Sequence, residues 1–188
     1  MITLLIIAGK LEINKILINT NQDHNIQSGV IKTNNSNIFF YNNIMHSDIP
    51  TIFLHGFAGS SNSWREIIYN ANFKCIAIDI VGHGNSKFKK IKKDYYLENW
   101  REDFSSLLEN LNLEKVNLCG YSMGARLAID FASYFPEKIN SLCLESGSVG
   151  TVDFFSKNQI LEEDKLLADK IMTNLISFVS YWEENKLF

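Results

Sequence analysis

The segment between residues 116 and 136 constrains the fold of this chain more than any other. The apolar run at residues 116–119 is typical of a short strand, and it leads directly into Gly120-Tyr121-Ser122-Met123-Gly124. A stretch with helical apolar spacing follows until Pro136. Glycines on both sides of Ser122 allow a sharp turn in which larger side chains would clash with neighbouring backbone. The pattern predicts a strand–turn–helix unit, with the Ser122 hydroxyl projecting from the edge of a sheet.

Short apolar runs alternate with helical segments along most of the remaining chain. Strands that are apolar throughout, rather than at every second position, are typical of parallel sheets buried on both faces. We therefore predict an α/β fold with a mostly parallel sheet and helices on both faces. The predicted strands are residues 30–33, 37–41, 51–55, 74–79, 116–119 and 139–144, and the predicted helices are residues 63–70, 95–110, 122–135 and 158–183.

The 188 residues divide into three predicted parts. Residues 1–29 combine a short apolar start with an Asn- and Gln-rich stretch, and we interpret them as an N-terminal extension. Residues 30–150 carry the predicted sheet, and residues 151–188 are mostly helical. With 46% hydrophobic residues, the chain is rich enough in apolar side chains for one domain with a buried core.

Composition argues against several kinds of partner. The formal net charge of −3 gives no basic footprint for nucleic acid. The apolar residues 2–8 are too few to span a bilayer and lack the basic flank of a signal peptide. The three cysteines each lie in an apolar run, so we interpret them as buried thiols of a reducing compartment: Cys75, Cys119 and Cys143. This predicts a cytoplasmic or organelle-stroma protein with no membrane partner, and it leaves the oligomeric state open.

Ser122 is the candidate nucleophile. A serine at the start of a helix also acts as an ordinary helix cap, and this alternative stays open. In acyl-transfer sites built on such a turn, two backbone N–H groups stabilise the oxyanion, one after the nucleophile and one from the loop after an earlier strand. In this sequence these would be Met123 and, after His55-Gly56, Phe57.

Two histidines lie in loops expected at the same sheet edge. We interpret His55 as organising the Gly56-Phe57 loop, with a direct catalytic role as the alternative. His83, in Gly82-His83-Gly84 after Asp79, is interpreted as shaping its loop. On this type of fold the base is expected after the nucleophile in the chain, whereas His83 precedes it.

Together these residues make the chain resemble the α/β-hydrolase superfamily. Within it, the chain resembles the family of 2-succinyl-6-hydroxy-2,4-cyclohexadiene-1-carboxylate (SHCHC) synthases of menaquinone and phylloquinone biosynthesis. Residues 120–126 match the Gly-Tyr-Ser-x-Gly-x-Arg of that family, and residues 144–150 resemble its Leu-Glu-Ser-x-Ser-Pro-Gly. Residues 164–168 and 181–188 resemble parts of its helical cap. The resemblance runs from about residue 30 to the end.

The resemblance implies a lyase that eliminates pyruvate from a small anionic substrate, a cyclohexene dicarboxylate carrying a succinyl group. No metal and no organic cofactor is implied. Ser122, activated by a histidine, would start proton abstraction, and the N–H groups of Phe57 and Met123 would hold the developing oxyanion.

The resemblance also implies residues that bind the substrate. Arg126, one helical turn after Ser122, would hold a carboxylate through two hydrogen bonds, with an ion pair inside its own helix as the alternative. Tyr121 and Trp182 would shape the pocket, unless they serve only packing. Lys157 stands in the stretch where the family's cap is rich in arginine, and a lysine is a poorer clamp for a carboxylate.

The chain departs from the family on its C-terminal side. The catalytic acid and base of the family follow the cap, whereas the histidines of this sequence all precede Ser122. We therefore expect a partial cap, missing C-terminal strands, and an apolar sheet edge at residues 139–144 that makes the chain alone poorly soluble and inactive. Three hypotheses stay open: an incomplete SHCHC synthase-like lyase, a carboxylesterase-type serine hydrolase, and a truncated non-catalytic α/β-hydrolase product.

Overall fold

The computed structural model describes residues 26–89, 95–150 and 154–184, without the side chains of residues 154–157 and 183. Its strands are β1 (Ile26–Lys32), β2 (Ser36–Asn43), β3 (Thr51–Leu54), β4 (Cys75–Ile78), β5 (Lys87–Phe88), β6 (Val116–Tyr121) and β7 (Ile139–Glu145). Its helices are η1 (Ser61–Trp64), α1 (Arg65–Asn70), α2 (Leu97–Asn110), α3 (Met123–Tyr134), η2 (Pro136–Lys138), α4 (Phe154–Thr173) and α5 (Leu175–Glu183), where η marks a 3₁₀ helix.

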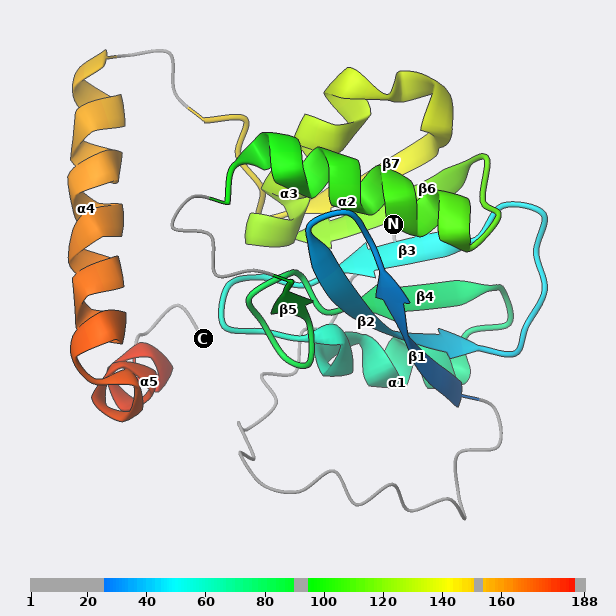
Figure 1. Ribbon diagram of the computed structural model, residues 1–188, viewed down its shortest axis with the longest axis horizontal. Helices are drawn as coiled ribbons and strands as arrows, with labels where there is room; N and C mark the ends of the chain where they lie inside the picture. The colour runs from blue at the N-terminus through cyan, green and yellow to red at the C-terminus, as the bar shows by residue number, and fades with distance from the viewer. Residues whose placement is uncertain (1–25, 90–94, 151–153, 185–188) are drawn as a thin grey trace. The chain divides into compact units, whose positions relative to one another are not determined.

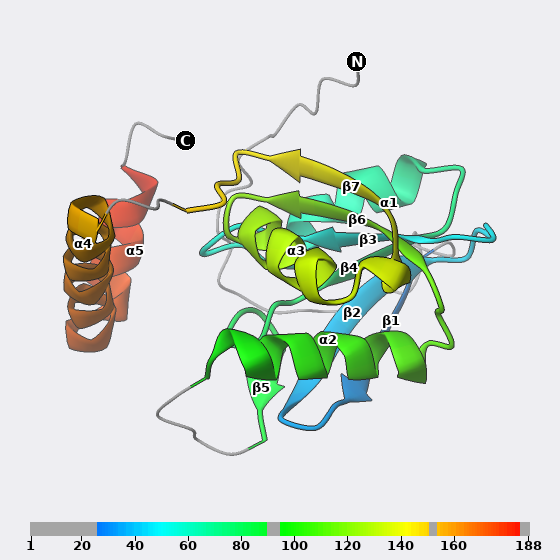
Figure 2. The same cartoon turned by 90° about the horizontal axis from the view of Figure 1, so that it is seen from above.

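Within the described residues, one sheet of seven strands has the order β1-β2-β4-β3-β6-β7, and β5 pairs with β2. Strands β4, β3, β6 and β7 run parallel, while β1, β2 and β5 add antiparallel pairs at one side. Helices α2 and α3 cover one face of the sheet and α1 covers the other (Figures 1 and 2). The predicted α/β fold is confirmed, and its sheet is mixed, with a parallel part formed by β4, β3, β6 and β7.

The core lies between the sheet and the helices α2 and α3. Apolar residues spaced three and four apart put one side of α2 against the sheet, as the sequence predicts. Trp100 stacks on Phe104 with ring centroids 4.9 Å apart, and Phe104 meets Phe131 of α3 edge-on at 4.7 Å. All three rings are buried. This core fixes α3, and with it the turn at Ser122, against the parallel strands.

The structure corrects several predicted boundaries. Strand β1 begins at Ile26, within the segment interpreted as an extension, and β5 was not predicted. The single helix expected at residues 158–183 is two helices, because Asn174 leaves the helical conformation at φ −160° and caps α5. Its side chain accepts a hydrogen bond from the Ser177 N–H at 3.0 Å.

Strand β7 forms an open edge of the sheet, as predicted for residues 139–144. Among the described strands it pairs with β6 alone, and Leu142 and Leu144 are 41% and 42% exposed. The interpretation of the cysteines is wrong for Cys143, which is exposed on β7, whereas Cys75 and Cys119 are buried. Cys143 lies in an apolar run like the others, but the edge strand has fewer neighbours to cover it.

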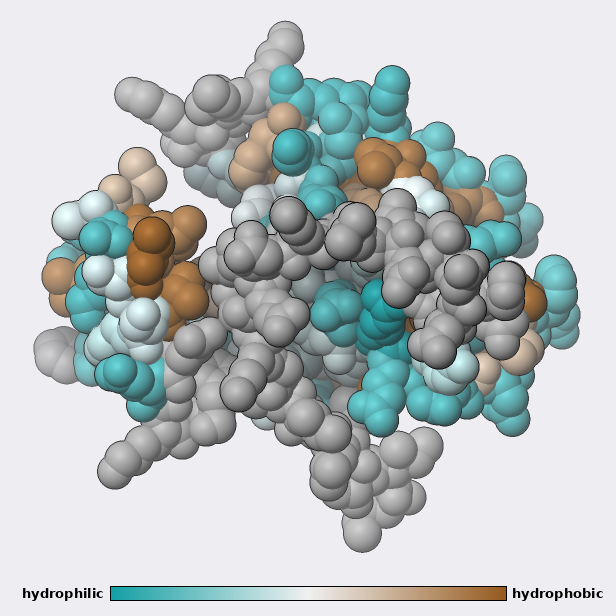
Figure 3. Space-filling view, turned by 90° about the horizontal axis from the view of Figure 1, so that it is seen from below, coloured by the Kyte–Doolittle hydropathy of each residue, from teal (hydrophilic) through white to brown (hydrophobic). Residues whose placement is uncertain are grey.

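The residues from Gly150 onward form a second compact unit, separate from the one that ends at Val149. Its helices α4 and α5 carry several exposed large hydrophobic side chains: Ile160, Leu161, Leu166, Met172, Leu175, Ile176 and Tyr181. Brown, hydrophobic clusters are visible on this unit in Figure 3. None of the described helices is long and apolar enough to cross a membrane.

Candidate active site

Ser122 occupies the turn between β6 and α3 in a strained conformation. Its φ of 52° and ψ of −110° lie where non-glycine residues are rare. Its N–H donates to the Glu145 carbonyl oxygen at 2.9 Å, and its own carbonyl oxygen accepts from the Arg126 N–H at 3.2 Å. Its side chain makes no capping hydrogen bond. The backbone is therefore held on both sides of the turn, and the helix-cap alternative does not describe the hydroxyl.

The glycines around Ser122 are required by close backbone contacts. A Cβ on Gly120 would lie 2.5 Å from the Gly124 carbonyl oxygen. A Cβ on Gly124 would lie 2.3 Å from the Leu54 carbonyl oxygen, at the end of β3. Real side chains do not reach such distances, so the turn closes directly onto the neighbouring strand.

Gly56 brings the loop after β3 against the nucleophile. A Cβ on Gly56 would lie 2.9 Å from Cδ1 of Tyr121 and 3.4 Å from Cβ of Ser122. The loop turns back at once, because the Gly59 N–H donates to the Gly56 carbonyl oxygen at 3.0 Å. Phe57, the candidate oxyanion donor, is therefore adjacent in sequence to a residue in contact with the elbow at residues 120–124.

Met123 is the first residue of α3, so its N–H has no acceptor within the helix. The helix N-terminus also carries a partial positive charge, which favours an anion at this position. The loop at Gly56-Phe57 and the start of α3 thus meet beside Ser122. This arrangement suits an oxyanion held by the N–H groups of Phe57 and Met123, a role that stays a prediction for both.

His55 is fully engaged by backbone groups. Its Nε2 accepts a hydrogen bond from the Ile80 N–H at 2.9 Å, which leaves Nδ1 to donate to the Gly56 carbonyl oxygen at 2.7 Å. Burial lowers the pKa of His55 to about 4. The neutral ring ties the ends of β3 and β4 together and has no nitrogen left for proton transfer. The geometry favours the loop-organising interpretation.

Asp79 acts as a second clamp under the same loops. Its carboxylate is buried and accepts hydrogen bonds from the Ser61 N–H at 2.6 Å and the Asn85 N–H at 2.7 Å. Gly84, at φ 50°, passes so close that a Cβ there would overlap this carboxylate. Asp79 therefore fixes η1 and the loop after β4, in keeping with the shape-defining role expected for this segment.

His83 packs among these groups. Its ring meets His55 edge-on at 5.1 Å and Phe57 at 6.0 Å. Its Nδ1 is buried without a hydrogen-bond partner among the described residues, and burial lowers the pKa of His83. His46 is exposed in the loop before β3, at the opposite sheet edge. In the part of the chain that the structure describes, no histidine hydrogen-bonds the Ser122 hydroxyl.

Arg126 is exposed on the first turns of α3 and makes no ion pair with any described residue. The carboxylate one turn further along, Asp130, bonds instead to Arg101 of α2 at 2.9 Å. Among the described residues, Arg126 therefore does not form the ion pair within its own helix that was the alternative interpretation. A guanidinium one turn from Ser122 remains available to an anionic ligand.

The other predicted binding residues divide between two units. The Tyr121 ring packs against Gly56 beside Ser122. Trp182 lies in the helical unit, where it stacks on Phe178 with centroids 5.7 Å apart. The side chain of Lys157 lies outside the described residues. The structure thus gathers Phe57, Tyr121, Ser122, Met123 and Arg126 on the core unit, while the roles of Trp182 and Lys157 stay predictions.

The end of β7 contributes to the site in ways that the sequence pattern did not indicate. The Glu145 carbonyl oxygen holds the Ser122 N–H, and Ser146 follows with a φ of 51°. Gly147 passes close to α3, since a Cβ there would lie 2.5 Å from Cβ of Ala125. A backbone carbonyl leaves no mark in residue types, although Gly147 is a signal for close approach.

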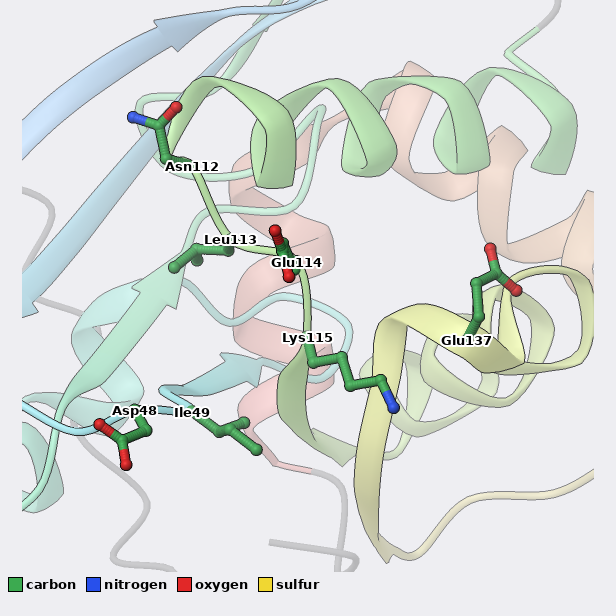
Figure 4. Close-up of a pocket in the computed structure, with 7 residues that line it drawn as sticks. All are labelled: Asp48, Ile49, Asn112, Leu113, Glu114, Lys115 and Glu137. Atoms are coloured by element: carbon green, nitrogen blue, oxygen red, sulfur yellow. The ribbon is translucent and has the colours of Figure 1, made fainter.

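A hollow of about 540 Å³ lies at the opposite, amino-terminal edge of the parallel strands. Its lining comes from the loops before β3 and β6 and from η2, and includes Asp48, Glu114, Lys115 and Glu137. In Figure 4 the carboxylates of Asp48 and Glu137 lie on different sides of the hollow and do not converge on one point. The described residues contain no group of three or more His, Cys, Asp or Glu that could hold a metal ion.

Comparisons with known proteins agree on the type of fold. The family model described as alpha/beta hydrolase fold matches residues 50–185. An epoxide hydrolase from Vigna radiata superposes with a TM-score of 0.58 at 22% identity, covering 64% of this chain and 40% of that one. At this identity the likeness concerns the fold alone.

Two curated relatives extend the comparison in sequence. The putative 2-succinyl-6-hydroxy-2,4-cyclohexadiene-1-carboxylate synthase of Bacillus subtilis is 38% identical over 139 residues, 72% of this chain and 50% of the relative. The chloroplastic protein PHYLLO of Arabidopsis thaliana is 32% identical over 146 residues, 73% of this chain and 8% of the relative. The chain thus spans about half the length of the Bacillus subtilis protein and a small part of PHYLLO.

Proposed function

Because this chain belongs to the α/β-hydrolase fold family, we propose that it provides the nucleophile side of an SHCHC synthase-like lyase in menaquinone or phylloquinone biosynthesis. The observation that carries the proposal is the elbow itself. Ser122 lies in a strained turn and its hydroxyl makes no capping hydrogen bond, and Arg126, one turn away, has no carboxylate partner among the described residues. The similarity to the synthase of Bacillus subtilis supports the substrate class.

In the proposed reaction, pyruvate is eliminated from a cyclohexene dicarboxylate that carries a succinyl group. Ser122, once activated by a base, starts the proton abstraction. The charge that develops on oxygen is held by the N–H groups of Phe57 and Met123, at a helix N-terminus that already favours negative charge. Arg126 holds a substrate carboxylate, which positions the substrate and selects anionic substrates over neutral ones.

The proposed mechanism needs a base that the described residues do not provide. His55 is neutral with both ring nitrogens engaged, and His83 packs against Phe57 and His55. We propose that the base and its acid partner lie outside the described residues. Reading the nucleotide sequence beyond codon 188 tests this directly, and a continuation that encodes a late Asp and a late His is the expected result.

The decisive assay follows pyruvate release from the succinyl-carrying cyclohexene dicarboxylate, with a neutral p-nitrophenyl ester as the competing substrate. In the full chain, meaning the 188 residues together with the proposed continuation, Ser122→Ala should lower the lyase rate by at least about 10³-fold. The oxyanion site without the serine hydroxyl should support only a small part of the rate. Unchanged lyase activity in Ser122→Ala would contradict the proposal. Turnover of the ester without pyruvate release would favour a carboxylesterase instead.

Substitution of Arg126 should affect the anionic and the neutral substrate differently. Arg126→Ala should weaken binding of the dicarboxylate about 10–100-fold, seen as a higher KM, since a charge-assisted bidentate bond is lost. It should leave ester turnover unchanged. Lys115→Ala removes an exposed cation at the opposite sheet edge and is the matched control. Equal effects of the two variants on the KM for the dicarboxylate would remove Arg126 from the substrate site.

The proposal includes no metal and no organic cofactor, and it places the protein in the cytoplasm or an organelle stroma. Activity of the full chain should survive exhaustive treatment with a chelator and gel filtration. Cell fractionation with an antibody against the chain tests the location, and recovery in a membrane fraction would contradict it.

A further inference from the structure

The ring of His83 lies against the two residues that flank Gly56. It meets the His55 ring with centroids 5.1 Å apart and the Phe57 ring with centroids 6.0 Å apart, edge-on in both pairs. Gly56 itself faces the elbow, since a Cβ there would lie 3.4 Å from Cβ of Ser122. This three-residue segment is therefore packed against the elbow at its middle residue and against His83 at both outer residues.

The backbone of His83 is held by hydrogen bonds on both sides of the ring. Its N–H donates to the Ile80 carbonyl oxygen at 2.9 Å, and its carbonyl oxygen accepts from the Ser86 N–H at 3.1 Å. The Asp79 carboxylate holds the same loop by accepting from the Asn85 N–H at 2.7 Å. A ring on a backbone held in this way can fix the position of its neighbours.

The two contacts of His83 differ in what they can add. His55 is already fixed, because both of its ring nitrogens bond to backbone groups. Phe57 instead lies in a strained turn, since the next residue, Ala58, has a φ of 60° that is rare outside glycine. Such strain persists only where neighbouring groups hold the backbone in place. The contact between the rings of His83 and Phe57 is suited to this task.

We propose that His83 is a positioning residue whose ring holds Phe57 so that the Phe57 N–H stays directed at the oxyanion site beside Ser122. The inference rests on the proposed role of that N–H in the reaction. Burial lowers the pKa of His83, so at neutral pH the contact joins two uncharged rings. Displacing a group in an active site by about 1 Å can cost up to about 10²-fold in rate.

The test measures kcat and KM for pyruvate release in the full chain. His83→Ala should lower kcat roughly 10–100-fold and change KM less than about twofold, because the displaced N–H weakens binding of the transition state alone. His83→Phe should restore kcat to within about threefold, since a ring again meets Phe57 edge-on. Phe88→Ala is the matched control. It removes a ring 3.6 Å from a Cβ placed on Gly82, in the same loop, and should leave both constants unchanged.

A double variant tests whether His83 acts through the Phe57 ring. Phe57→Leu removes this ring and keeps the N–H. In that background, His83→Ala should lower kcat little further, because two residues that act as one unit have effects that do not add. Fully additive effects would overturn the proposal. An unchanged kcat in His83→Ala, or a loss confined to KM, would overturn it as well.

Nuclear magnetic resonance separates this inference from the proposed lyase activity. In isotope-labelled protein, the amide signal of Phe57 should shift or broaden in His83→Ala and stay in place in Phe88→Ala. An unchanged Phe57 signal in His83→Ala would refute the inference, even where Ser122→Ala abolishes pyruvate release. If the protein hydrolyses the ester and releases no pyruvate, the lyase proposal fails. The same loss of kcat in His83→Ala is then expected with the ester, because acyl transfer also forms an oxyanion.

Discussion

Strands β6 and β7 lie side by side and have similar apolar sequences, yet one is buried and the other is exposed. Val116 and Leu118 of β6 are 0% and 1% exposed, whereas Leu142 and Leu144 of β7 are 41% and 42% exposed. Of the strands that the structure describes, β6 has neighbours on both sides, but β7 has only β6. An apolar run therefore predicts a strand, while its position in the sheet decides how much of its surface is buried.

The largest expected effect comes from removing the same side chain from the two strands. Leu118 and Leu142 are register partners. Leu118→Ala should lower the free energy of unfolding by about 2–5 kcal/mol, because it opens a cavity in the packed core. Leu142→Ala should cost less than about 1 kcal/mol, because this side chain is already 41% exposed. Urea unfolding followed by circular dichroism measures both.

Equal losses of unfolding free energy in Leu118→Ala and Leu142→Ala would contradict the difference in burial between β6 and β7. They would mean that β7 is covered in solution by something that packs as closely as the core does on β6. The double variant Leu118→Ala/Leu142→Ala measures the interaction between the two side chains. Because the register partners are neighbours, their effects on the free energy of unfolding need not add.

The second prediction concerns the loops at the carboxyl ends of β3 and β4. Burial lowers the pKa of His55 to about 4 in the folded chain, against about 6.5 when unfolded. Below pH 6.5 the unfolded chain binds a proton that the folded chain does not bind. Stability should therefore fall as the pH falls from 6.5 towards 4, by up to about 3 kcal/mol from this residue.

Urea unfolding at a series of pH values should reveal this slope, and His55→Asn should flatten it. His46→Asn, at an exposed position, should leave the slope unchanged. Part of the slope should survive in His55→Asn, because burial also lowers the pKa of His83. Identical slopes in wild type and His55→Asn would mean that His55 is not buried as a neutral ring.

The site at the carboxyl ends of the parallel strands could be predicted from the sequence only in part. The elbow was predictable because Gly120 and Gly124 stand where a side chain would overlap the backbone. The nearness of Gly56 to Ser122 followed from the rule that parallel strands end at one edge. The hydrogen bond from Ser122 to the Glu145 carbonyl was not predictable, since any residue offers a carbonyl oxygen.

Most strands and helices were predictable for a similar reason, because their apolar spacing is set by burial against one core. The break at Asn174 was missed because the apolar spacing continues through it, although its side chain caps α5. The exposure of Cys143 was missed because its apolar neighbours in the sequence are like those of the buried cysteines, although residues 139–144 were expected at the edge of the sheet.

The third prediction tests the carboxylate under the loops. Asp79→Asn replaces one of two acceptor oxygens with an amide that cannot accept the N–H of Ser61 or Asn85. A buried backbone donor left without a partner should cost about 1–3 kcal/mol. Asp48→Asn, an exposed carboxylate at the other sheet edge, is the control and should change stability by less than about 0.5 kcal/mol. A loss equal to that of the control would mean that the loops do not depend on this clamp.

The smallest effect on stability, but a visible effect on association, is expected from a charge on the open edge. Leu142→Lys should change the free energy of unfolding by less than about 1 kcal/mol, because the long side chain reaches solvent from an exposed position. It should also reduce self-association, since a lysine on an edge strand opposes pairing with another chain. Size-exclusion chromatography with light scattering measures the change.

Ser133→Lys adds the same charge on the exposed side of α3 and controls for net charge. If both variants reduce association equally, charge repulsion alone explains the effect; if only Leu142→Lys does, the unpaired edge of β7 is the surface through which chains meet.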